Sequence, residues 1–179
     1  MQRLLAEKRE AILRRWLDLI LDSYPADTRG FLRSPKNQFT NPVGHTITEA
    51  IASLYEQLLQ GDRLEEAAEA MERLIRVRAV QDMAPSEAVG FIPALKNVLR
   101  QEMGQLPGED LQALQELEQR IDGLTLQAFD LYSLCKERLY QIRVDEIRMR
   151  TERLLKMANL VVEWPEQEGD GMAGETPGA

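Results

Sequence analysis

The residue types that most often carry chemistry are scarce in this chain, which has one histidine, His45, and one cysteine, Cys135. A structural zinc site needs four ligands, usually Cys or His at short spacings, and the sequence does not supply them. A globin-like haem site needs a histidine in a late helix, whereas His45 stands in the first turn of an early predicted helix. Cys135 falls among apolar residues at helical spacing, where a thiol packs and does not react. We therefore predict no catalytic residue, no metal and no other cofactor, and a protein that is not an enzyme.

Charged side chains gather in two places. In the first, basic residues alternate with acidic ones on one predicted helix, which is typical of a solvated, salt-bridged face; the set comprises Glu65, Glu66, Glu69, Glu72, Arg63, Arg73 and Arg76. In the second, 136–156, seven basic residues are interrupted by four acidic ones. This stretch is either a solvated helix face or a docking face for a partner or a second copy. Binding to an anionic membrane surface would need a stronger apolar face beside the basic one.

The composition excludes other classes of function. The net charge is −8 without a concentrated basic face, so we expect no nucleic-acid binding, which depends on neutralising phosphates. No stretch approaches the ~20 apolar residues of a membrane-spanning helix. A single cysteine cannot form an intrachain disulfide, and we predict a cytoplasmic protein. Association with a membrane complex stays open.

The elements that position these residues are predicted to be helices throughout. Helix formers such as Leu, Ala and Glu are abundant, and valine, threonine and aromatic residues are sparse, which favours an all-α domain. An amphipathic helix is predicted over 2–23 and a long loop over 25–41. Asn41-Pro42 is expected to open the next helix, since Asn caps free N–H groups and Pro fits the first turn. A later helix begins at Pro85, with a kink predicted at Pro93.

A long helix is predicted from about 108 to 163. Its apolar residues recur at alternating steps of four and three, a coiled-coil-like pattern; this seam comprises Leu117, Ile121, Leu124, Ala128 and Leu131 and leads on to Cys135. We predict that the seam pairs with a second copy, which makes the protein a homodimer. Gly123 is a candidate position for a break or a bend. The predicted architecture is one bundle of five to six helices over 1–164, with a globin-like arrangement as one version, followed by a disordered acidic tail at 165–179.

A resemblance to a known family appears between Trp16 and Phe91. Its landmarks in order are Trp16, Tyr24-Pro25, Phe31-Leu32, Phe39-Thr40-Asn41-Pro42-Val43-Gly44 and Pro85-Ser86-Glu87-Ala88-Val89-Gly90-Phe91. The pattern resembles the N-terminal domain of RsbRD, an RsbT co-antagonist of the bacterial stress-response complex, over roughly residues 10 to 150. The resemblance implies a dimeric helical sensor or interaction module whose relatives look like globins without haem. Because only the acidic tail follows the long helix, we expect no output domain.

From these observations we predict a non-enzymatic regulatory or accessory protein of bacterial signalling, which acts through contacts with a protein partner of unknown identity. The predicted binding site for this partner or for a ligand comprises Phe31, Phe39, Asn41, Pro42, Gly44 and His45. Two explanations of Gly44 stay open, namely close helix packing within the domain and the approach of a ligand or another backbone. The alternative function is a sensor that binds a small ligand in an internal pocket between helices.

Overall fold

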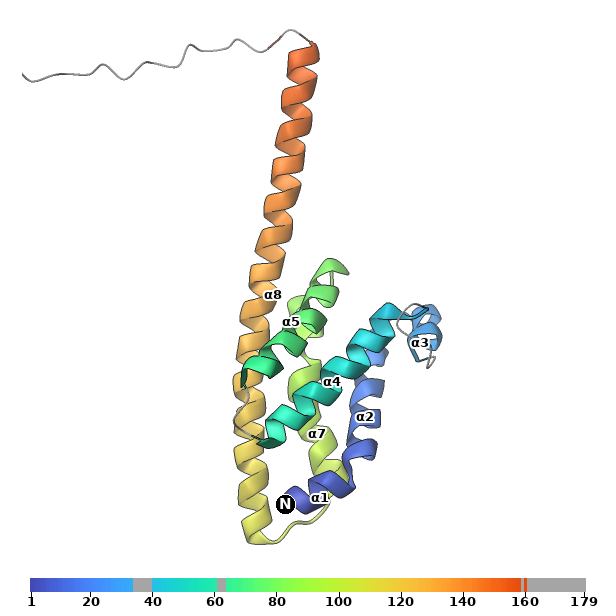
Figure 1. Ribbon diagram of the computed structural model, residues 1–179, viewed down its shortest axis with the longest axis vertical. Coiled ribbons are helices and arrows are strands. Elements are labelled where there is room, and N and C mark those ends of the chain that lie inside the picture. Colours follow the sequence, from blue (N-terminus) through green and yellow to red (C-terminus); the bar gives the residue numbers. More distant parts are fainter. Residues whose placement is uncertain (34–39, 61–63, 159, 161–179) are drawn as a thin grey trace, which may run out of the picture. The chain divides into compact units, whose positions relative to one another are not determined.

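A computed structural model of the chain describes residues 1–33, 40–60, 64–158 and 160. These residues form helices and no strand, which confirms the predicted all-α class (Figure 1). The helices are α1 (Gln2–Glu7), α2 (Arg9–Asp22), α3 (Ala26–Arg33), α4 (Pro42–Gln60), α5 (Leu64–Val80), α6 (Pro85–Val89), α7 (Phe91–Met103) and α8 (Gly108–Met157). The chain divides into two compact units, Met1–Leu139 and Tyr140–Ala179, and α8 contributes residues to both. The predicted domain end at residue 164 and the tail lie outside the described residues, and the globin-like arrangement stays a prediction.

The described residues hold eight helices where five to six were predicted, because two predicted segments are organised differently. The helix predicted over 2–23 is divided at Lys8, between α1 and α2. Part of the predicted loop over 25–41 is α3, which begins after Pro25. The Pro25 carbonyl accepts hydrogen bonds from the backbone N–H groups of Thr28 and Arg29, at 2.9 and 3.1 Å. Proline is pre-organised for this first-turn geometry, so α3 begins directly after Pro25.

The kink predicted at Pro93 is instead a division between α6 and α7 at Gly90, three residues earlier. Proline cannot donate a hydrogen bond to the carbonyl four residues before it, which here belongs to Val89, the last residue of α6. Pro93 itself lies in the first turn of α7, where the backbone N–H groups lack a partner within the helix in any case. The hydrogen bond that Pro93 cannot make therefore interrupts the helix about one turn before the proline.

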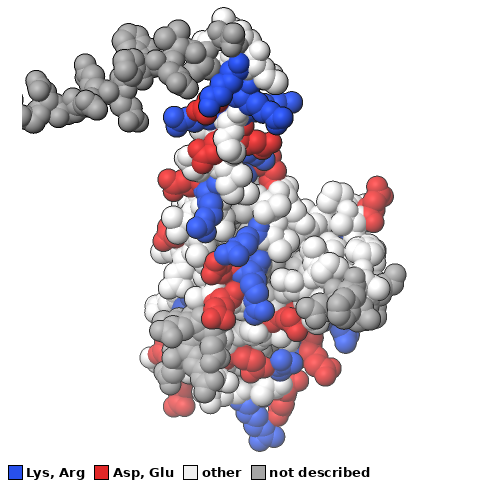
Figure 2. Space-filling model, turned by 45° about the horizontal axis from the view of Figure 1, so that its top comes forward, with Lys and Arg blue, Asp and Glu red and all other residues white. Residues whose placement is uncertain are grey.

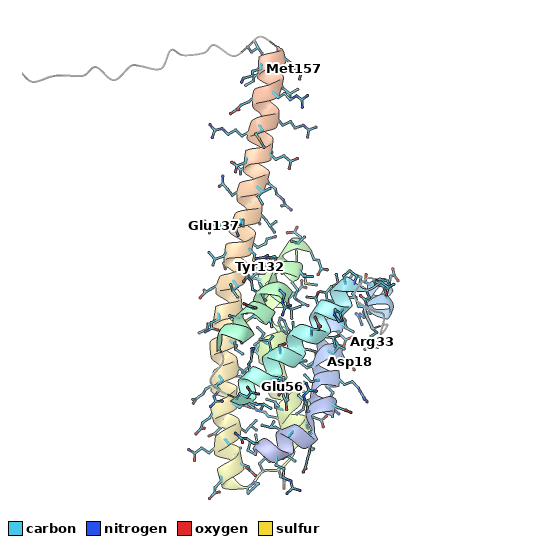
Figure 3. The ribbon with its side chains drawn as sticks, viewed as in Figure 1. Asp18, Arg33, Glu56, Tyr132, Glu137 and Met157 are labelled. Atoms are coloured by element: carbon cyan, nitrogen blue, oxygen red, sulfur yellow. The ribbon has the colours of Figure 1, made fainter. Side chains whose placement is uncertain are left out.

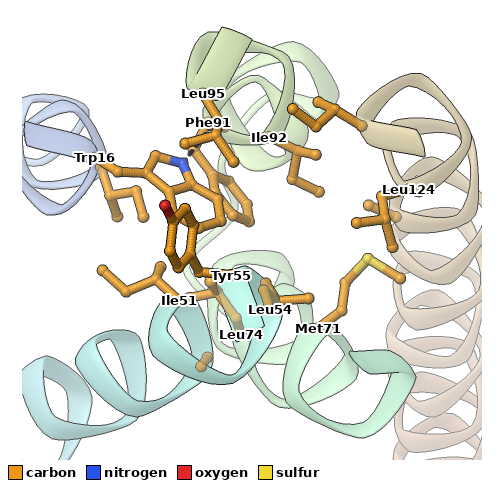
Figure 4. Close-up of a cluster of buried hydrophobic side chains, with 14 of the residues drawn as sticks. Trp16, Ile51, Leu54, Tyr55, Met71, Leu74, Phe91, Ile92, Leu95 and Leu124 are labelled. Atoms are coloured by element: carbon orange, nitrogen blue, oxygen red, sulfur yellow. Dashed lines mark hydrogen bonds between the residues drawn. The ribbon is translucent and has the colours of Figure 1, made fainter. Parts of the chain in front are cut away.

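The core of the first unit forms where the apolar faces of its helices meet (Figure 4). Trp16 of α2 donates its indole N–H to the Phe91 carbonyl at 2.7 Å, and its ring centre lies 6.2 Å from that of Phe91. Tyr55 of α4 donates its hydroxyl to the Leu5 carbonyl at 3.0 Å. Both large side chains are fully buried with their polar atoms satisfied, so they join distant parts of the chain without a desolvation penalty.

Hydrogen bonds attach the first part of α8 to the other helices of this unit. Arg120 donates to the Leu58 carbonyl at the end of α4 at 3.1 Å. Tyr132 donates its hydroxyl to the Met83 carbonyl in the turn between α5 and α6. Arg100 of α7 binds both carboxylate oxygens of Glu118 at 2.6 and 2.7 Å. Gly123 lies within α8 without interrupting it, so the break considered there does not occur.

Candidate interaction site

The predicted site at 31–45 is the corner between α3 and α4, and the buried side chain of Asn41 closes it. The Asn41 amide donates to the carbonyls of Phe31 and Leu32 at 3.1 and 3.0 Å. Its side-chain oxygen accepts from the backbone N–H of Gly44 at 2.9 Å. Asn41 therefore caps the start of α4, as predicted, and also satisfies the last carbonyls of α3.

Gly44 is required by the close packing of this corner. A Cβ atom at this position would lie 2.6 Å from the Leu32 carbonyl oxygen and 2.7 Å from the side-chain oxygen of Asn41. Both distances are shorter than side chains tolerate, and neither atom is the mobile end of a long side chain. Of the two explanations that the sequence left open, close helix packing within the domain accounts for the glycine.

The other predicted residues of this site differ in how accessible they are. Phe31 is 49% exposed and Pro42 is also exposed, so both retain surface that a partner could contact. The His45 imidazole is partly exposed and lies 3.2 Å from the Glu49 carboxylate one turn along α4. Phe39 falls outside the described residues. Ion pairs on the outer side hold α3 against α2, between Arg33 and Asp18 at 2.7 Å (Figure 3) and between Arg29 and Asp22 at 3.1 Å.

The predicted dimer seam lies inside the first unit and is not a surface for a second copy. Leu117, Ile121, Leu124 and Ala128 are buried, and Leu131 is partly buried against the same core. Figure 4 shows Leu124 of α8 directed toward Met71 of α5. The alternating spacing was recognised correctly, but the side chains that cover it come from this chain's own helices.

Arg78 of α5 is a buried arginine that the sequence did not single out. Its guanidinium donates to the Ser23 hydroxyl and the Glu87 carbonyl, each at 2.8 Å, and lies 5.4 Å from the ring centres of Tyr24 and Phe91. Two of its nitrogen atoms and the Tyr24 hydroxyl are buried with no hydrogen-bond partner at bonding geometry among the described residues.

Burial governs the electrostatics of this pair. Desolvation lowers the pKa of the Arg78 guanidinium, and desolvation raises the pKa of the Tyr24 hydroxyl against the opposing effect of the Arg78 charge. Arg78 thus joins the end of α2 to α5, α6 and α7 through ring faces and neutral oxygen atoms. The sequence signal that could have found Arg78 is its helical spacing from the apolar residues Met71, Leu74 and Ile75.

The described residues offer little for metal or membrane chemistry. Among them, no group of three or more His, Cys, Asp and Glu side chains is placed to hold a metal ion. None of the helices described is both long and apolar enough to cross a membrane. Cys135 is partly buried against the core of the first unit.

The described part of the second unit carries an apolar surface that the other described residues do not bury. All of its described residues, 140–158 and 160, are exposed. The large apolar side chains among them are Tyr140, Ile142, Val144, Ile147, Met149, Leu154, Leu155, Met157 and Leu160. Basic and acidic side chains lie between these apolar residues along this part of α8 (Figure 2). Exposed apolar residues as numerous as these on one helix segment are typical of a surface that another molecule covers.

Comparison with known proteins identifies one family. The sequence model of the family described as RsbT co-antagonist protein rsbRD N-terminal domain matches residues 10–147, which include the helices of the first unit from α2 onward. No curated protein and no solved structure matches the chain.

Proposed function

Since the chain belongs to the family of RsbRD N-terminal domains, we propose that it is a bacterial regulatory module that acts by binding another protein and catalyses no reaction. The family description names a co-antagonist, a protein that acts on the activity of another. We propose that the regulated process is a stress response. A single cysteine supports a cytoplasmic location, since it cannot form an intrachain disulfide.

One observation carries this proposal. The segment from Tyr140 onward exposes large apolar residues, among them Ile147 at 64% and Val144 at 56%. Scattered apolar residues are normal on a protein surface, but a continuous stripe of them on one helix costs solubility unless a partner covers it. The first unit also has exposed apolar residues, such as Leu126 at 69%, but it buries an extensive apolar core, whereas every described residue of the second unit is exposed. The second unit is therefore the region that best supports a role in binding.

A photo-crosslinking residue introduced at position 147 tests the proposal in cells that produce the protein natively. Irradiation is expected to give a covalent adduct with another protein, because the Ile147 side chain lies on the apolar stripe. The matched control carries the same residue at Glu146, which is exposed on a different face of the same helix turn. Failure to form any adduct at position 147, or equal adducts at both positions, would contradict a binding role for this stripe.

A second candidate function is the sensor with an internal ligand, and a cavity in the first unit favours it. The cavity has a volume of about 130 Å³ and lies between α1, α4 and the start of α8; its lining includes Leu5, Leu59, Leu117 and Arg120. Pockets for drug-sized ligands measure roughly 300–1,000 Å³, so this one would take a molecule of a few heavy atoms. Native mass spectrometry of protein purified from its own cells tests this, because a bound molecule adds its mass.

A further inference from the structure

The exposed stripe of the second unit has the residue pattern of a coiled coil. Steps of four and three connect Tyr140, Val144, Ile147, Thr151, Leu154 and Ala158, which are the core positions a and d of a heptad repeat. Positions a hold Val144 and Thr151, which are β-branched, and positions d hold Ile147 and Leu154. We call these six residues the Val144 stripe. Because the Val144 stripe occupies only two of the seven heptad positions, its width matches the contact that a single partner helix makes.

The charges beside the Val144 stripe have one sign. The flanking positions e and g, which face a partner helix across a coiled coil, hold Arg143, Arg148 and Arg150 and no acidic residue. The acidic residues of this part of α8 lie at the outer positions instead; they are Asp145, Glu146 and Glu152. Arg148 pairs with Glu152 at 3.1 Å, but both side chains are more than half exposed, and such a pair opens at little cost.

From this arrangement we propose that the Val144 stripe binds an amphipathic helix of another protein whose flanking positions are acidic. The inference rests on the proposed function, because it names the chemistry of the partner that this function requires. Apolar residues of the partner helix would cover Val144, Ile147 and Leu154. Its Glu or Asp residues at e and g would lie beside Arg143, Arg148 and Arg150, and these charges decide which helices bind.

A second copy of this chain does not fit the same face. In a parallel pair, position g of one helix faces position e of the next heptad on its partner, which places Arg143 opposite Arg148 on both sides. In an antiparallel pair, g faces g and e faces e, so arginine again faces arginine or a neutral residue. No acidic residue stands at these positions to relieve the repulsion.

An anionic membrane surface fits less well than an acidic helix. A helix that lies in a lipid interface has a broad apolar face and a basic polar face. Here the polar positions include Asp145, Glu146 and Glu152, which an anionic surface repels. Of the apolar helix residues outside the Val144 stripe, Leu155 and Met157 flank it only in its last heptad, whereas Ile142 and Met149 lie on another side of α8. The narrow stripe and the mixed outer charges favour a single helix.

Two designed peptides of about three heptads test the proposal with the full-length chain. Both have Val or Leu at a and d; one carries Glu at e and g, and the other carries Lys there. In fluorescence anisotropy the Glu peptide is expected to bind at least about tenfold more tightly than the Lys peptide, and its affinity is expected to fall with added salt. The triple variant Arg143→Glu, Arg148→Glu, Arg150→Glu is expected to reverse the preference. The control Arg153→Glu, Lys156→Glu changes charges at outer positions and is expected to leave the preference unchanged.

The outcomes separate this inference from the proposed function. No binding of the Glu peptide, or equal affinity for both peptides, overturns the acidic-helix inference. Sedimentation of the chain as a dimer that Ile147→Asp dissociates overturns it in favour of a second copy, and stronger binding to phosphatidylserine vesicles than to the Glu peptide overturns it in favour of a membrane. If position 147 still crosslinks a protein in cells, the proposed function stands while the acidic-helix inference fails. Loss of that crosslink removes the proposed function itself.

Discussion

Two segments of α8, Gly108–Leu139 and Tyr140–Met157, carry the same kind of apolar repeat in opposite surroundings. In the first segment, Ile121 and Leu124 are buried among side chains from other helices of their unit. In the second, Ile147 and Leu154 occupy equivalent positions of a repeat and are 64% and 55% exposed. The repeat therefore shows that a helix has an apolar face, while the residues that cover this face belong to distant parts of the chain or to another molecule.

The same substitution in the two segments should give the largest contrast. Ile121→Asp places a carboxylate at a fully buried position, and we expect a loss of at least about 4 kcal/mol in the free energy of unfolding, because the charge has no partner there. Ile147→Asp adds a charge at an exposed position and should change the stability by less than about 0.5 kcal/mol. Urea denaturation followed by circular dichroism measures both. Comparable losses would mean that the second segment is also packed into a core.

Replacement of two helical glycines by alanine should change the stability of the protein in opposite directions. At Gly44 the added methyl group meets Leu32 and Asn41, and overpacking of this kind typically costs about 1–3 kcal/mol. At Gly123, on the solvent side of α8, a Cβ atom meets no other atom within 4 Å, so the variant should gain up to about 1 kcal/mol from the higher helix propensity of alanine. Thermal unfolding of both variants tests this. A stabilised Gly44→Ala would show that the α3–α4 corner is looser than its hydrogen bonds imply.

The features predictable from the sequence are those that depend on residues near each other in the chain. Asn41 was recognised as a helix cap because its side-chain oxygen accepts a hydrogen bond from the N–H group of Gly44, only three residues away. The apolar repeat of α8 was recognised for the same reason. The kink predicted at Pro93 lies only one turn from the observed helix division at Gly90, because the hydrogen bond that proline cannot make is the one to the Val89 carbonyl.

Features that depend on distant residues were not predictable. The Asn41 side chain also binds the carbonyls of α3, which the sequence analysis had assigned to a loop. The seam residues Ile121 and Leu124 were assigned to a dimer because no sequence pattern shows that they belong to the chain's own core. The role of Arg78 depends on Ser23, at the end of α2, and on Glu87 of α6, which are both distant from it in the sequence or in another helix. A single sequence carries no signal for such contacts.

The buried region should also respond to pH through Tyr55, at a smaller scale. Burial raises the pKa of Tyr55 to about 12, helped by the negative charge of Glu56 and opposed by Arg9. An unfolded chain ionises tyrosine near ~10. The folded state thus favours the neutral hydroxyl, and its stabilising contribution is complete below about pH 10 and is lost as the pH rises through about 12. Urea denaturation at rising pH should show a steeper loss of stability for the wild type than for Tyr55→Phe; equal slopes would contradict the shift.

The smallest expected difference separates the ion pairs of the two segments. Arg148 and Glu152 are one turn apart on an exposed part of α8, and a double-mutant cycle with alanine should give a coupling of about 0.3–0.5 kcal/mol. Arg100 and Glu118 connect α7 to the first segment of α8 through two hydrogen bonds, and the Glu118 side chain is only 13% exposed. The coupling of Arg100 and Glu118 should therefore be the larger of the two, because two packed helices already hold these side chains in place and less side-chain entropy is lost on pairing.

Both couplings should weaken as salt is added, and the coupling of the exposed pair should lose a larger share of its value. A coupling for Arg148 and Glu152 equal to that of Arg100 and Glu118 would mean that the second segment is ordered by contacts beyond its own helix, which is the condition expected only when a partner is bound.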